Sequence, residues 1–122
     1  MKNVAASLQA FLEGFGVPAY DDNSLPGNAT LPYLTYTPVI TVWRDSTLFL
    51  VRLWDYPGPD QSADRLYEIV DRISEAVGEG IRIPAEEGYI TLYKGNPWAQ
   101  PQPTPEIRAR VIILNFEITT YI

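Results

Sequence analysis

The sequence has 122 residues, the usual size of one domain, and its 9 basic against 15 acidic residues give a net charge of −6. Such an acidic chain is poorly suited to neutralise phosphates or an anionic membrane surface, which disfavours nucleic acid and such membranes as binding partners. The sequence contains no cysteine and no histidine. Their absence excludes disulfides, thiol nucleophiles, the usual zinc sites and Ser-His-Asp catalysis.

The chain begins with an amphipathic pattern over 4–15, which predicts a helix. Asn3 is suited to cap this helix, and the glycines that follow are suited to end it. Segment 17–32 is rich in proline and aspartate and predicts a loop. No stretch resembles a signal peptide or reaches the roughly 18 apolar residues of a membrane span, so we expect a soluble protein made in a cytoplasm. The apolar positions of the helix are Val4, Leu8, Phe11, Leu12 and Phe15.

Strand signals follow at 33–36 and 39–43, and after a short polar break they resume at 47–54. Pro38 cannot donate a backbone hydrogen bond, so it indicates an edge position or a bulge. These segments predict an antiparallel hairpin.

A second amphipathic helix is predicted after the turn at 56–60. Asp60 or Ser62 is suited to cap it, and Gly78 and Gly80 to end it. Its opposite face is charged, as expected of a solvated face. The apolar positions are Leu66, Ile69, Val70, Ile73 and Val77.

Two further strands are predicted at 81–84 and 89–93, on either side of a turn at 86–88. Residues 94–97 are expected to end the second of these strands, because they contain glycine and proline. The proline-rich segment 98–105 is expected to form a loop.

A final apolar run fills 107–121 without glycine or proline. As one strand it would span roughly 50 Å at about 3.3 Å per residue, whereas most strands have about 3 to 10 residues. Its apolar face also changes side along the run, since Ile113 belongs to the first face and Phe116 and Ile118 to the second. Three explanations are open: a bulge within one subunit, an end that pairs or packs against a neighbouring subunit, or a break into two strands.

The paired carboxylates at Asp21–Asp22 and Glu86–Glu87 are the only candidate catalytic groups that the sequence offers. Adjacent carboxylates can bind a hard cation or share a proton. However, Leu25 stands where a calcium loop needs an oxygen ligand, and neighbouring glutamates in a turn are usually solvated. No glycine-rich loop opens a helix, so no phosphate loop is predicted. We therefore predict no enzyme, no metal site and no cofactor.

The predicted fold class is α+β, with a mainly antiparallel sheet, two amphipathic helices packed on it and a long C-terminal strand. We expect one domain over 1–122, since no repeat or separate linker interrupts the sequence.

Two motifs add a resemblance to a known family. Leu31-Pro32-Tyr33-Leu34-Thr35-Tyr36 follows the first helix, and Lys94-Gly95-Asn96-Pro97 precedes the proline-rich segment. Together with the order of the elements, they resemble the small tail-terminator (tail-completion, or minor capsid) proteins of long-tailed bacteriophages and prophages. The resemblance covers nearly the whole chain. Because the motifs are not catalytic signatures, they indicate the fold better than the activity.

The resemblance implies a structural virion protein that forms a ring, typically a hexamer, at the head-proximal end of the tail. The ring would stop polymerisation of the tail tube, and it would assemble in the cytoplasm of the host bacterium. The implied partners are further copies of the chain, the tail tube protein and the head–tail connector protein. DNA would be passing cargo only, and no membrane is involved.

A head-to-tail ring needs heterologous interfaces that close, and the long terminal strand is suited to supply one side. An acidic chain also suits a lumen through which DNA slides, because it repels phosphates. The subunit-interface candidates are Trp98, Arg108, Arg110, Phe116, Ile118 and Tyr121. The lumen-facing candidates are Asp21, Asp22, Glu86 and Glu87.

Two other classes of protein remain open from the residues. One is an acidic cytoplasmic adaptor, chaperone or immunity-type binding protein, which would form a dimer or a 1:1 complex. The other is a small hydrolase or binding module that uses carboxylates, which requires a concave polar site.

Overall fold

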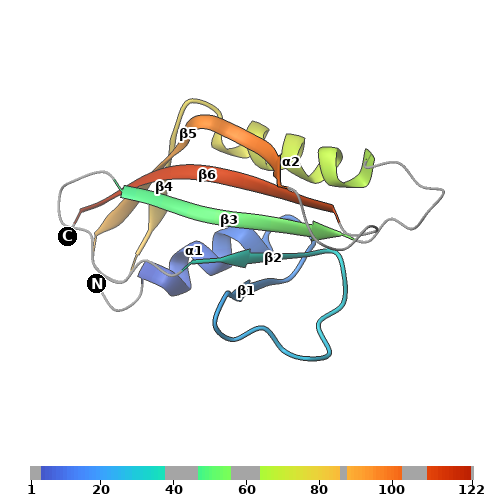
Figure 1. Ribbon diagram of the computed structural model, residues 1–122. Coiled ribbons are helices and arrows are strands. Elements are labelled where there is room, and N and C mark those ends of the chain that lie inside the picture. The colour runs from blue at the N-terminus through green and yellow to red at the C-terminus, as the bar shows by residue number, and fades with distance from the viewer. Residues whose placement is uncertain (1–3, 38–46, 56–63, 86–87, 103–109, 122) are drawn as a thin grey trace.

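A computed structural model describes residues 4–37, 47–55, 64–85, 88–102 and 110–121. These residues form a six-stranded curled sheet and two helices (Figure 1). This architecture confirms the predicted α+β fold. The elements are α1 (Val4–Glu13), β1 (Ala19–Asp21), β2 (Tyr33–Tyr36), β3 (Thr47–Asp55), α2 (Asp64–Val77), β4 (Ile81–Pro84), β5 (Tyr89–Gln102) and β6 (Arg110–Tyr121).

The sheet has the strand order β1-β2-β3-β6-β5-β4. The pairs β2–β3 and β4–β5 are antiparallel, as the two predicted hairpins require. Strand β6 lies in the middle, antiparallel to both β3 and β5. Only β1 runs parallel to its neighbour, β2. The sheet is therefore mainly antiparallel, with the long C-terminal strand at its centre.

One hydrophobic core joins the sheet to both helices. Inward side chains of β3 and β6 pair directly across the strands, as Phe49 does with Phe116 and Val51 with Leu114. Buried residues of both helices belong to the same core. The predicted apolar faces are confirmed for α2 throughout and for α1 at Val4, Leu8 and Leu12, while Phe11 and Phe15 are partly buried at the core's margin. Both helices thus cover the same face of the sheet.

Helix α1 contacts both edge strands, β1 and β4, which the curl of the sheet brings to its two sides. Strand β1 lies within 17–32, where only a loop was predicted. It was missed because it has three residues and pairs with β2 through the nonlocal register Ala19 to Leu34. Segment 39–43 lies outside the described residues.

Strand β5 is much longer than predicted. Residues 94–97 do not end it, and 98–102 continue the ladder with β6 instead of forming a loop. The register shifts between Lys94 and Ala99, where extra residues bulge out of β5 and the Asn96–Pro97 peptide is cis. Gly95 lies against β6 there, and a Cβ atom on it would stand 2.9 Å from the Asn115 carbonyl oxygen. The bulge that the sequence suggested for β6 thus lies in its neighbour.

Over its described length, β6 keeps the same face toward the core, with buried side chains at 112, 114, 116, 118 and 120. On the opposite face Val111 and Thr119 are buried as well and Ile113 is half-buried, so apolar residues lie on both faces at the start of the strand. Between Val111 and Ile118, β6 is paired on both edges, with β3 on one side and β5 on the other. A neighbouring subunit therefore cannot add a strand to this stretch of β6.

Candidate interaction surfaces

The acidic pair Asp21–Asp22 supports the loop that joins β1 to β2. The Asp21 carboxylate accepts a hydrogen bond of 2.8 Å from the Asn23 backbone N–H. The Asp22 carboxylate accepts one of 2.8 Å from the Thr37 hydroxyl and lies 3.9 Å from the Arg52 guanidinium. Both carboxylates thus have local structural roles. Glu86 and Glu87 lie outside the described residues.

Within the described part of the chain, no three acidic side chains gather as a metal site would require. Neither α1 nor α2 is long and apolar enough to cross a membrane.

The six interface candidates fall into different environments. Phe116 and Ile118 are completely buried, so they fill the core of a single chain. Trp98 is half-buried and packs edge-on against Phe116, with ring centroids 4.9 Å apart. Arg110 and Tyr121 are exposed at the two ends of β6. Arg108 lies outside the described residues.

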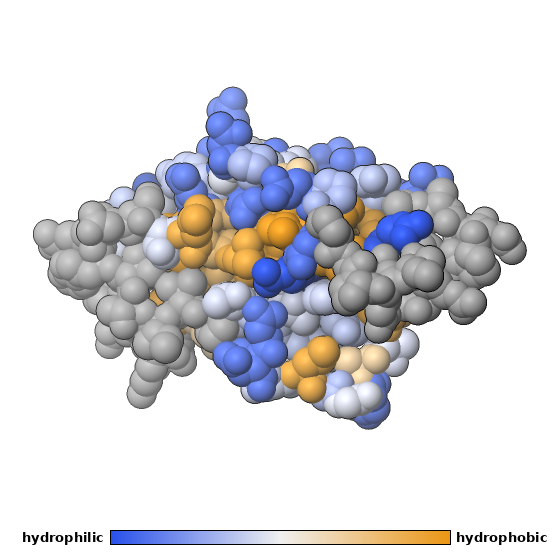
Figure 2. All heavy atoms as spheres, in the orientation of Figure 1, coloured by the Kyte–Doolittle hydropathy of each residue, from blue (hydrophilic) through white to orange (hydrophobic). Residues whose placement is uncertain are grey.

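The face of the sheet that points away from the helices, here called the outer face, carries a band of apolar side chains. Leu48 is 66% exposed, and Leu50, Trp54 and Ile113 are half-buried on the same face. Figure 2 shows this band across the central strands, interrupted by hydrophilic groups. Near-continuous apolar strands are typical of sheets covered on both faces, and contiguous apolar patches mark interaction sites. The outer face is therefore the strongest candidate for contact with another molecule.

Polar contacts hold the outer face in a fixed form. The Arg52 Nε–H donates to Gln102 Oε1 at 2.9 Å, which joins β3 to β5 across β6. The Trp54 indole N–H donates to the Thr35 hydroxyl at 3.0 Å, which joins β3 to β2. A surface fixed in this way loses little side-chain entropy when it binds a partner.

Helix α2 is anchored by an ion pair at the end of β3. The Asp55 carboxylate is buried and accepts two hydrogen bonds from the Arg65 guanidinium, from Nε and from Nη2. This contact raises the pKa of Arg65, so the guanidinium stays charged. A two-pronged contact fixes direction as well as distance, so it orients the first turn of α2 against the sheet.

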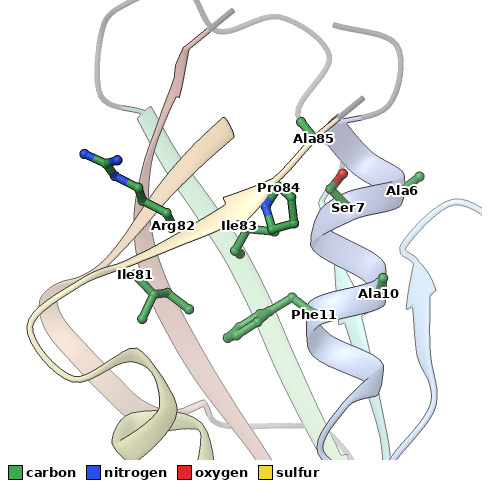
Figure 3. A pocket seen from close by; sticks show the side chains of 9 residues that line it. All are labelled: Ala6, Ser7, Ala10, Phe11, Ile81, Arg82, Ile83, Pro84 and Ala85. Carbon is green, nitrogen blue, oxygen red and sulfur yellow. The ribbon is translucent and has the colours of Figure 1, made fainter. Parts of the chain in front are cut away.

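A groove lies between α1 and the edge strand β4, with a volume of about 760 Å³. Ala6 and Ala10 line it from α1 and leave room because their side chains are small. Figure 3 shows Phe11, Ile81 and Ile83 on its inner side, whereas Arg82 extends away from α1. Among the residues that the structure describes, the lining consists of Ala6, Ser7, Ala10, Phe11, Ile81, Arg82, Ile83, Pro84 and Ala85.

A smaller pocket of about 360 Å³ lies on the outer face beside β4. The Arg82 guanidinium stacks over the Tyr89 ring at 4.6 Å, and Tyr89 stacks on Tyr121 at 5.0 Å. These contacts occupy the aromatic faces that would otherwise hold a ligand. Arg82 and Tyr121 thus both pack on the Tyr89 ring.

Comparison with family models and with curated proteins gives no match. Among solved structures, the chain is similar to one from the virion of a native gene transfer agent (GTA) particle. The TM-score is 0.63 at 18% sequence identity, and the match covers 91% of this chain and 84% of the other. Likeness at this identity shows a shared fold.

Sequence reasoning missed both the outer-face band and the groove. The band is visible in the sequence only as apolar residues at both odd and even positions of β3, a pattern that signals cover on two faces. The groove gives no signal at all, because alanines on a helix and isoleucines on a short strand are ordinary core residues.

Proposed function

We propose that this chain is a structural protein of a phage-like virion. The shared fold with a virion chain, which extends over most of both molecules, carries this proposal. The apolar outer face supports it, because a protein that assembles with others needs a surface that its own helices leave uncovered.

More specifically, the chain forms a ring that ends the tail tube at its head-proximal end and joins it to the head connector. The two sequence motifs that suggest this role both lie in the sheet. Tyr33–Tyr36 of the first motif forms β2, and residues 94–97, the second motif, begin the bulge of β5. In this proposal 1–122 acts as one folding unit, and Trp98, Arg110 and Tyr121 remain as interface candidates.

The lumen of this ring is lined by acidic residues that repel the DNA passing through it. Asp21, Asp22, Glu86 and Glu87 keep this assignment as the lumen-facing candidates. Charge reversal at Asp21 is expected to slow DNA delivery while the ring stays assembled.

The proposal is tested by deleting the gene in cells that produce the particle and imaging the products by electron microscopy. Without the ring nothing stops tube polymerisation, so we expect overlong tails and heads that lack tails. The chain supplied in trans should restore tails of uniform length.

Tails of normal length joined to heads in the deletion strain would contradict the proposal. Mass spectrometry of purified particles distinguishes a virion protein from a cytoplasmic adaptor or chaperone. A virion protein stays in the finished particle, whereas an adaptor or chaperone leaves it.

A further inference from the structure

We draw no further inference here: the strongest candidate, the apolar outer face around Leu48 and Ile113 on β3 and β6, carries no proposal because nothing in the described part of the chain shows what covers it, and Arg52 beside it is already bonded to Gln102 within the chain.

Discussion

At the scale of single residues, Gly80 shows how closely the turn into β4 is specified. Its φ of +134° lies in a region that other residues rarely adopt. A Cβ atom at this position would stand 2.3 Å from Cε1 of the Tyr93 ring. Two independent constraints, backbone and packing, therefore require glycine where α2 passes into the sheet.

Gly80→Ala is expected to lower the free energy of unfolding by about 1–3 kcal/mol, the usual cost of a strained backbone position. Chemical denaturation measures this change. The control is Gly27→Ala, which should have little effect because no atom lies within 4 Å of the added Cβ. Tyr93→Ala added to Gly80→Ala should recover only the steric part of the loss. Equal stability of the two glycine variants would refute the argument.

At the scale of elements, one hydrogen bond ties α1 to β2. The Tyr36 hydroxyl donates to Gln9 Oε1 at 2.6 Å. Burial raises the pKa of Tyr36 above its ordinary value of 10.0, and the nearby carboxylates of Asp21 and Glu13 raise it further. The fold thus favours the neutral phenol, which is the form that donates this bond.

The stabilising contribution of Tyr36 should be complete below pH 10 and should be lost as the pH rises through its folded pKa. We expect Tyr36→Phe to cost about 0.5–1.5 kcal/mol at pH 7. Denaturation of both proteins between pH 7 and 11 should show this difference shrinking above pH 10. A difference that stays constant up to pH 11 would show that Tyr36 does not titrate as described.

At the scale of the whole molecule, a substitution on the outer face is expected to affect assembly much more than the stability of the single chain. Leu48 is 66% exposed, so Leu48→Asp should lower the free energy of unfolding by only about 1 kcal/mol, mainly because the new carboxylate stands opposite Glu117. If the outer face contacts another virion protein, the same variant should be largely missing from purified particles. Mass spectrometry of the particles measures this loss.

Tyr67→Asp is the matched control, because Tyr67 is also exposed and apolar but lies on α2. It should enter particles as the unmodified chain does. Normal incorporation of Leu48→Asp would remove the outer face from the assembly surfaces.

Elements with local signals were predictable from the sequence. The apolar stripe of α2 and the alternation around the two hairpins depend on neighbours in the chain, so periodicity finds them. The length of β5 was not predictable, because its prolines resemble a loop and only pairing with β6 keeps Pro101 and Gln102 in the ladder. Strand β1 was missed for the same reason, since its partner is distant in the sequence.

The candidate surfaces were less predictable than the fold. Phe116 and Ile118 seemed available for an interface because the central position of β6 is not visible in the sequence. In the structure both are enclosed on the core face. The groove depends on the curl that brings β4 to α1, and curl is a property of the complete sheet.

The central place of β6 also bears on how the protein is made. During synthesis β1, β2 and β3 leave the ribosome first, followed by β4 and β5, yet no described strand pair joins these two groups except through β6. Each group therefore waits with an unpaired edge until β6 has emerged. Pairing over such long sequence separations is slow because loop closure comes first. The nascent chain thus completes its sheet after translation of β6, and any contact with another molecule that depends on the curl can form only then.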